Sequence, residues 1–267
     1  MKTNDRQERV PLDYFLLVFV LAIPLWLIGG DKLPIPVNLP LSALTTFCPL
    51  IAAALLSYRR FGLPAVQGLL KKSVDYKKIH NRLWYIPTLL LAPLLYLLSY
   101  ALMRWAGMPL PELQTPLWLA PLFFVVYFIA DTGEELGWTG YTIDPMQKRW
   151  GALNASLLLG LIWAMWHSIA FIQTDNPANW ILWQCLKTVA MRVIIVWIYN
   201  NTGKSVFAAI LYHTTDNVSW SLFPYYGSQY NPMVTGLITS ITAAIIVYGW
   251  GAKTLSRYRY ARAAQTA

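Results

Sequence analysis

The amino-acid sequence predicts an all-α protein, a polytopic membrane bundle of about eight transmembrane helices with both termini cytoplasmic. The first observation is composition: 57% of the 267 residues are hydrophobic and only 12% are charged, whereas a soluble domain has about 25% charged residues. The second is that the hydrophobic residues form long runs separated by short polar or Pro-rich breaks. A run of roughly 20 apolar residues spans the hydrocarbon core as a helix. Lipid offers no hydrogen-bond partners, so the backbone N–H and C=O groups must bond one another, as they do in a helix.

Eight such runs follow one another along the chain. Their limits are 12–30, 39–57, 83–105, 117–141, 152–172, 180–200, 204–222 and 232–251. The first run follows a basic segment, but Gly-Gly-Asp-Lys-Leu-Pro comes after it rather than a small-x-small cleavage site, which indicates a retained anchor. The runs 117–141 and 152–172 are weaker because polar residues interrupt them. Aromatic residues such as Trp84, Trp118 and Trp180 near run ends are typical of membrane interfaces.

The placement of basic residues is the third observation. Seventeen of the 21 Lys and Arg residues fall in the N-terminus, in the breaks after even-numbered runs and in the C-terminal tail. Lys32 and Arg104 occupy the opposite breaks, and Lys187 and Arg192 lie inside the run 180–200. Because basic residues favour the cytoplasmic side, this alternation supports eight crossings and cytoplasmic termini. We expect a single integral membrane domain over residues 1–267 in contact with the lipid bilayer. The sequence contains no basic domain interleaved with aromatic residues, so nucleic-acid binding is not predicted.

Ionisable side chains inside a bilayer are costly, so each is a candidate functional residue. They cluster in three runs: Asp131, Glu134 and Glu135 in 117–141, His167 in 152–172, and His213, Asp216 and Asn217 in 204–222. Residues four apart share a helix face, which groups Asp131 with Glu135, and His213 with Asn217. The polar side chains of the three helices can hydrogen-bond one another only if they face a common interior.

This set of side chains suits the attack of water on an amide carbonyl. A buried Glu beside a like charge is a good general base near neutral pH. One His can help to orient the water, and a second His with an Asn can donate hydrogen bonds to an oxyanion. Two His and a Glu could alternatively hold a divalent metal, but the HExxH spacing is absent. From the residues alone, a hydrolase and a proton-coupled transporter both remain open.

At these residues the chain resembles the CAAX prenyl endopeptidase and bacteriocin-processing family of intramembrane proteases. The family pattern is Glu-Glu-x-x-x-Arg, then aromatic-x-x-x-His, then His-x-x-x-Asn. The corresponding segments here are Glu134-Glu135-Leu-Gly-Trp-Thr139, Trp163-Ala-Met-Trp-His167 and His213-Thr-Thr-Asp-Asn217. Their order and spacing agree with the family over roughly residues 117–222, which would form the catalytic core helices.

The resemblance implies a role for each matched residue. Glu134 would activate water with the help of His167, Glu135 would be a supporting carboxylate, and His213 with Asn217 would form the oxyanion site. The substrate would be a peptide or protein at the membrane, of which a prenylated CAAX sequence is one example, and the enzyme would be a multi-pass protein of a bacterial plasma membrane. We expect no cofactor and no obligatory metal, with zinc as the alternative.

Two positions depart from the family pattern. Thr139 replaces the motif Arg, and Trp163 replaces the usual Phe. We expect Arg192, in the run 180–200, to supply the missing positive charge. Because Thr139 puts activity in question, the alternatives are a catalytically inactive membrane binding or immunity protein and a proton-coupled transporter. Counting ~1.5 Å per residue also places Glu134 and His167 at different depths, unless the helices are offset or the run 117–141 continues as a helix past Tyr141.

Overall fold

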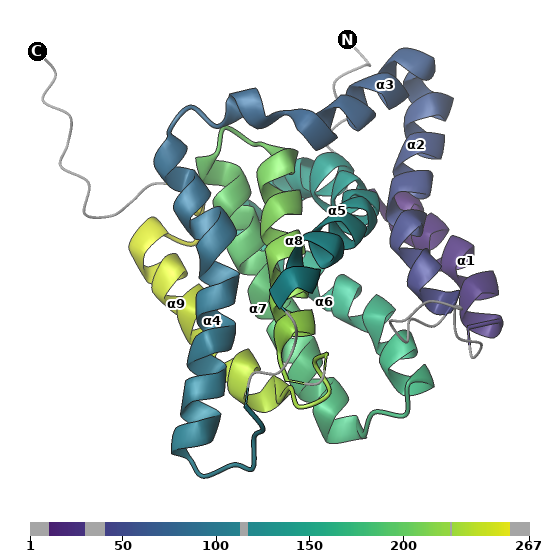
Figure 1. Ribbon diagram of the computed structural model, residues 1–267. Helices are drawn as coiled ribbons and strands as arrows, with labels where there is room; N and C mark the ends of the chain where they lie inside the picture. The colour runs from purple at the N-terminus through teal and green to yellow at the C-terminus, as the bar shows by residue number, and fades with distance from the viewer. Residues whose placement is uncertain (1–10, 30–40, 113–116, 225, 257–267) are drawn as a thin grey trace, which may run out of the picture.

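A computed structural model describes residues 11–29, 41–112, 117–224 and 226–256 (Figure 1). Within these ranges the chain is all-α, with no strand and with nine α-helices. They are α1 (Leu12–Leu27), α2 (Cys48–Phe61), α3 (Leu63–Lys71), α4 (Tyr85–Trp105), α5 (Ala120–Gly137), α6 (Asp144–Gln173), α7 (Ala178–Asn201), α8 (Val206–Leu222) and α9 (Pro232–Trp250). The prediction of a polytopic helical bundle is confirmed.

A helix lies at each of the eight expected runs. In the described part of the chain, five helical stretches are long and apolar enough to cross a membrane: Ser42–Phe61, Arg82–Trp105, Leu117–Gln173, Ala178–Asn201 and Pro232–Trp250. The α1 helix is a shorter apolar helix, and α8 has 17 residues. The exact number of crossings stays a prediction, and the two termini lie outside the described residues. The α3 helix, inside the basic break after α2, was not expected.

The connection between α5 and α6 corrects one expected boundary. The expected break at 142–151 is wrong, because a π-helical segment, Trp138–Ile143, carries α5 directly into α6. The chain reverses at Gly151, which has φ 77° and ψ 168°, a backbone conformation that Gly adopts readily. Glu134 lies 17 residues before this turn and His167 lies 16 residues after it. The two arms reach about 25 Å from the turn at ~1.5 Å per residue, so both residues come to the same depth.

The described basic segments meet at one end of the bundle. Lys72 Nζ donates to the carbonyl of Gly140 at 2.5 Å, and Lys204 Nζ pairs with Asp144 at 2.9 Å. Asn200 in α7 donates to the carbonyl of Thr254 after α9 at 2.8 Å. Four basic segments therefore lie at the same end of the bundle, as the charge pattern predicted. They are the breaks after α2, after α7 and after α9, and the turn around Gly151.

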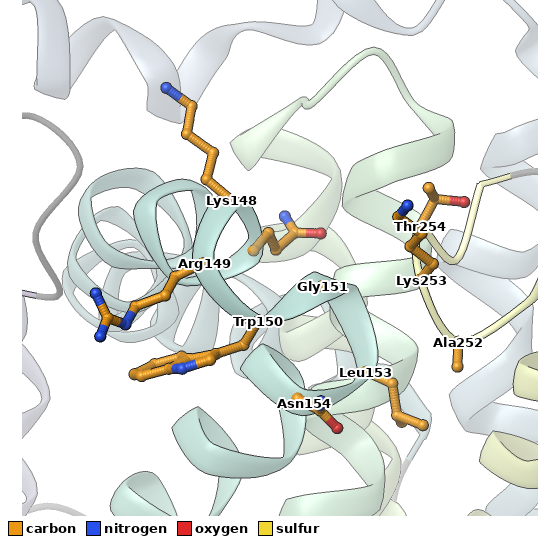
Figure 2. Close-up of a pocket in the computed structure, with 10 residues that line it drawn as sticks. Lys148, Arg149, Trp150, Gly151, Leu153, Asn154, Ala252, Lys253 and Thr254 are labelled. Carbon is orange, nitrogen blue, oxygen red and sulfur yellow. The ribbon is translucent and has the colours of Figure 1, made fainter. Parts of the chain in front are cut away.

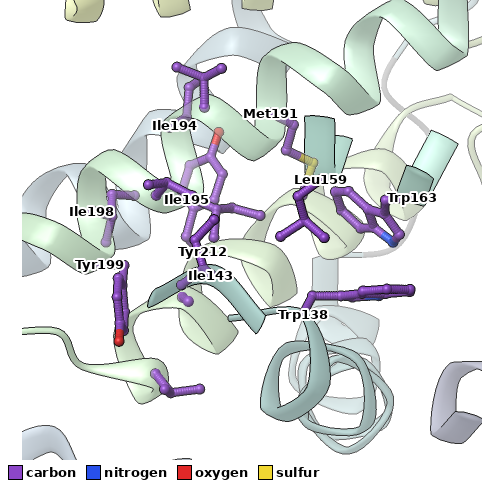
Figure 3. Packing of buried hydrophobic residues seen from close by; sticks show 14 of the residues in the cluster. Trp138, Ile143, Leu159, Trp163, Met191, Ile194, Ile195, Ile198, Tyr199 and Tyr212 are labelled. Carbon is purple, nitrogen blue, oxygen red and sulfur yellow. The ribbon is translucent and has the colours of Figure 1, made fainter. Parts of the chain in front are cut away.

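The α7 helix forms the centre of the packing. It contacts α6, α8 and α9, and Val193 to Tyr199 are buried without interruption. Figure 3 shows Ile194, Ile195 and Ile198 of α7 among side chains from neighbouring helices. A helix buried on nearly every face has a fixed rotation, because any turn about its axis would open cavities in a close-packed interior. This fixes the direction in which α7 presents its polar side chains.

We predict that Gly151→Ala destabilises the protein by roughly 1–2 kcal/mol, because an L residue resists positive φ. The added Cβ would also lie 3.3 Å from the carbonyl oxygen of Lys253. Denaturant titration in detergent micelles measures the change. Gly68→Ala is the matched control, since Gly68 lies inside α3 and its added methyl would have no atom within 4 Å. It should be neutral or slightly stabilising; equal loss in both variants would contradict the prediction.

Candidate active site

The polar residues from three expected runs lie together inside the bundle. The α5 helix contributes Asp131, Glu134 and Glu135, which are at most 5% exposed. The α6 helix contributes His167, α8 contributes His213 and Asn217, and α7 contributes Arg192. Contacts of 2.8–3.6 Å connect Asp131, Glu135, Arg192, His213 and Asn217. Glu134 contacts His167 at 3.7 Å and the indole of Trp163 at 2.7 Å, and the Trp163 ring lies under Arg192, which joins the two groups into one cluster. The structure thus brings together every site residue that the sequence predicted.

Glu135 is held by a buried arginine. Arg192 donates from Nη1 to Oε2 at 2.8 Å and from Nη2 to Oε1 at 3.1 Å, a bidentate pairing in which both side chains are 0% exposed. The hydroxyl of Thr139 also donates to Oε2 at 2.5 Å, and Arg192 reaches this hydroxyl at 3.3 Å. The expected position of Arg192 is confirmed: the guanidinium lies beside the carboxylates and contacts Thr139, which stands where the family has Arg.

Glu134 has a different environment from its neighbour. Its Oε2 accepts the indole N–H of Trp163 at 2.7 Å and lies 3.7 Å from Nε2 of His167. Its Oε1 accepts the hydroxyl of Thr46 at 3.3 Å. No Lys or Arg of the described residues forms an ion pair with Glu134. Side chains of consecutive residues point about 100° apart on a helix. Glu135 is therefore paired with Arg192 of α7, while Glu134 faces the imidazole of His167 in α6.

His213 and Asn217 are organised by Asp131. Asn217 Nδ2 donates to Oδ1 of Asp131 at 2.9 Å, and His213 Nε2 lies 3.6 Å from the same oxygen. The opposite ring nitrogen of His213 is 3.0 Å from Oε1 of Glu135. Coulomb attraction from carboxylates on both sides stabilises a positive charge on this ring. One N–H of the Asn217 amide stays available for another acceptor, since the group has two.

Two glycines of α5 allow the close approach that completes this arrangement. A Cβ on Gly133 would lie 2.8 Å from the carbonyl oxygen of Thr46, and one on Gly137 would lie 2.6 Å from the backbone of Pro49. Small residues four apart let membrane helices pack backbone to backbone. The start of α2 can therefore approach α5, and Thr46 bonds both the carbonyl of Ala130 and the carboxylate of Glu134.

Sequence reasoning missed three contributors to the cluster. It noted Asp131 without giving it a role, although the four-residue spacing to Glu135 was the available signal. It treated Trp163 as a tolerated aromatic substitution, whereas the indole N–H bonds Glu134. Thr46 carried no motif of its own; the Gly-x-x-x-Gly spacing of Gly133 and Gly137 was the available sign that another helix approaches here.

A second buried ion pair lies beside the cluster. Lys187 of α7 pairs with Asp216 of α8, and both side chains are at most 5% exposed. The hydroxyl of Tyr96 in α4 donates to Asp216 at 3.4 Å. Asp216 directly precedes Asn217, so this pair fixes α8 against α7 next to a cluster residue. Both charges of α7 thus hold helices that carry cluster residues.

The zinc alternative finds no fitting set of ligands. Among the described residues, no three His, Cys, Asp or Glu side chains are grouped so that they could hold a metal ion. Both oxygens of Glu135 are engaged by Arg192. Glu135 therefore serves Arg192, and Asp131 accepts from Asn217, so these carboxylates bind protein groups and do not fit a metal ion.

Comparison with known proteins supports the expected relationship. Residues 116–219 match the family described as type II CAAX prenyl endopeptidase Rce1-like. This range contains all three motifs and overlaps the predicted core, 117–222. Over this range the chain is similar to that family, which agrees with the resemblance found in the three motifs. The chain is also 33% identical over 137 residues to a protein of Methanococcus maripaludis named CAAX prenyl protease 2, which covers 48% of this chain and 49% of the relative. The chain thus spans about half the length of that relative.

We predict that Arg192→Met destabilises the bundle by about 3–5 kcal/mol, because it leaves the Glu135 carboxylate buried without its cation. The double variant Arg192→Met/Glu135→Gln should recover most of that loss, since it removes both charges. Denaturant titration of the single and double variants in detergent measures the coupling. Strictly additive effects of the two substitutions would contradict the ion pair as the cause.

Proposed function

We propose that this chain is an intramembrane endopeptidase in which Glu134 activates a water molecule for attack on a peptide bond. The observation that carries the proposal is the unequal environment of the adjacent carboxylates. Glu135 is paired with a guanidinium on both oxygens, whereas Glu134 faces an imidazole. A carboxylate fixed by Arg is a poor proton acceptor, and an unpaired one is a good general base.

Glu134 and His167 have the spacing to share one water. A water about 2.8 Å from each hydrogen-bonding atom fits across the 3.7 Å that separate Oε2 from Nε2. Glu134 would accept a proton from this water as its oxygen attacks the carbonyl carbon. The Trp163 indole and the Thr46 hydroxyl would keep the carboxylate in place. The proton on Glu134 would then pass to the leaving amine.

His213 and Asn217 would stabilise the negative oxygen that develops in this attack. Nδ1 of His213 faces Glu135 at 3.0 Å, so Nε2 can donate to an oxyanion when the ring carries both protons. The carboxylates of Glu135 and Asp131 stabilise that charged ring. Donors fixed in advance in a low-dielectric interior supply a large part of the catalytic effect in such reactions.

The exposure of the cluster indicates where a substrate would approach. The side chain of His167 is 25% exposed, while that of Glu134 is 6% exposed. The ring of His167 stacks on Phe171 with centroids 5.7 Å apart. We infer that a membrane-associated peptide reaches Glu134 past His167, in the plasma membrane of a bacterial cell. A CAAX-type peptide is one candidate, because the relative from Methanococcus maripaludis is named CAAX prenyl protease 2.

Two other functions were open from the sequence. The inactive binding or immunity protein rested on the loss of the motif Arg at Thr139, and Arg192 provides a guanidinium at that place. A proton-coupled transporter would use the same carboxylates and His residues as a relay. Cleavage of a peptide library by the purified chain separates the protease from both alternatives, since neither produces new peptide ends.

We predict that Glu134→Gln lowers kcat/KM for peptide cleavage by at least about 10²-fold, the lower range of a positioned general base. The amide keeps the shape of the side chain, so the folded yield in detergent should be unchanged. Glu112→Gln is the control, because Glu112 is exposed outside the cluster and should cleave as the unaltered protein does. Unchanged cleavage by Glu134→Gln would refute the assignment.

We predict a smaller loss for Trp163→Phe, which restores the family residue and removes one hydrogen bond to Glu134. A hydrogen bond to a carboxylate contributes about 1.5–3 kcal/mol, equivalent to roughly a ten- to 100-fold fall in kcat with little change in KM. The ring that covers Arg192, whose Cζ lies 4.1 Å from the Trp163 centroid, is largely kept. Steady-state kinetics of the two proteins measure kcat and KM separately. A change confined to KM would argue against a role of Trp163 in positioning Glu134.

A further inference from the structure

A hollow of about 620 Å³ opens at the basic end of the bundle (Figure 2). We call it the basic hollow. Lys148, Arg149 and Lys253 are among its ten lining residues, and none of the ten is acidic. Backbone bonds connect its two walls: Ala152 N donates to the carbonyl of Lys253 at 2.9 Å, and Leu153 N to that of Ala252 at 3.0 Å. The main chain therefore fixes its shape, and basic side chains set its charge.

In the described part of the chain, the charges of the basic hollow have no carboxylate partner. Within the described ranges, no ion pair involves Lys148, Arg149 or Lys253. Figure 2 shows Arg149 beside Trp150, with its Cζ 5.8 Å from the ring centroid. Elsewhere at this end, Lys204 does pair with a carboxylate, that of Asp144. The hollow is therefore complementary to an anion.

An apolar groove continues from the basic hollow along the bundle. This groove, about 590 Å³, lies between α6, α7 and α9 and shares Leu153 and Ala252 with the hollow. Its other lining residues are mostly aliphatic: Leu157, Leu186, Val189, Ala190, Val193, Ser240, Ala243, Ala244, Val247 and Tyr248. From Ser240 to Tyr248, the lining residues of α9, the helix rises about 12 Å at ~1.5 Å per residue. One leaflet of hydrocarbon has a similar depth, half of ~30 Å.

We propose that the basic hollow and the apolar groove together form a binding site for one anionic phospholipid. The phosphate would lie in the basic hollow, where the exposed side chains of Lys148, Arg149 and Lys253 would turn toward it, and one acyl chain would lie along the groove. The continuity of the two parts identifies the occupant. A free phosphate would leave the groove uncovered, and a zwitterionic lipid would leave the positive charge uncompensated. The hollow lies at the ends of membrane-spanning helices, where Trp150 is placed as interfacial Trp residues are.

The bound lipid would connect parts of the chain that are far apart in sequence. The basic hollow joins the Gly151 turn of α6 to the segment after α9, and the groove touches α7. Because a ligand that binds only the folded state stabilises it by RT ln(1 + [L]/Kd), an anionic lipid would hold the turn that aligns Glu134 with His167. The site is separate from the carboxylate cluster and does not depend on the proposed peptidase activity.

The test is lipid binding by the full chain in detergent, followed by native mass spectrometry with a long-chain phosphatidylglycerol as the probe. The triple variant Lys148→Ala/Arg149→Ala/Lys253→Ala should weaken binding on the order of 100-fold, since each basic side chain near an anionic surface contributes about 1 kcal/mol. Its control is Arg59→Ala/Lys71→Ala/Lys77→Ala, which removes the same charge from exposed residues of the α2–α3 region. This control should change binding less than threefold.

A second pair of variants tests the groove. Ala244→Trp fills the groove and should weaken binding at least tenfold. Ile241→Trp enlarges a side chain of α9 that is 60% exposed and does not line the groove, so it should leave binding unchanged. Phosphatidylcholine with the same acyl chains and inorganic phosphate are the comparison probes. Both should bind at least tenfold more weakly than phosphatidylglycerol.

Three results would overturn the proposal. Equal loss in the two triple variants would mean that overall charge attracts the lipid without a site. Phosphatidylcholine binding as tightly as phosphatidylglycerol would remove the role of the basic side chains. Inorganic phosphate binding as tightly as the lipid, with no effect of Ala244→Trp, would assign the hollow to a free anion.

Discussion

The ion pair between Arg192 and Glu135 is the interaction on which the site depends. Both side chains are fully buried, so neither charge has an exposed alternative, and removal of one leaves the other uncompensated. The pair fixes α5 against α7, and His213 extends it to α8 through its own bond to Glu135. Its chemical consequence is the difference between adjacent carboxylates: once Glu135 is neutralised, Glu134 is left to face His167.

The surrounding packing holds this pair in place. The part of α7 from Ala190 to Tyr199 is buried on every face, which fixes the direction of Arg192. Gly160 of α6 lets that helix approach α7 closely, since a Cβ there would lie 2.9 Å from the Val189 backbone and 3.2 Å from Cβ of Arg192. The same arginine lies over the ring of Trp163, whose N–H bonds Glu134. The neutralised and the free carboxylate are therefore connected through one aromatic side chain.

The outer surface of the bundle complements this interior. Polar groups are gathered inside, and the outward faces of α1, α4, α5 and α9 carry exposed aliphatic residues such as Leu16, Leu94, Val125 and Ile245. The basic hollow interrupts this pattern at the charged end, where a short hydrophobic groove continues from three positive side chains. Peptide chemistry and lipid recognition would thus use separate regions of one helical framework, joined by the turn at Gly151.

Sequence alone determined the class of the protein and the identity of the polar residues that meet inside it. Composition and run length predicted a polytopic helical bundle, because backbone N–H and C=O groups inside lipid can bond only one another. The cost of burying polar groups pointed to three runs, the match to the family motifs selected Glu134, Glu135, His167, His213 and Asn217 within them, and the loss of the motif Arg at Thr139 pointed to Arg192. Tertiary structure decided the rest. It extended α5 to the turn at Gly151, which gave Glu134 and His167 equal depth, and it gave Asp131, Thr46 and the Trp163 indole their partners. These contacts depend on helix rotation and close backbone approach, which long-range packing sets and which hydrophobic run length does not encode.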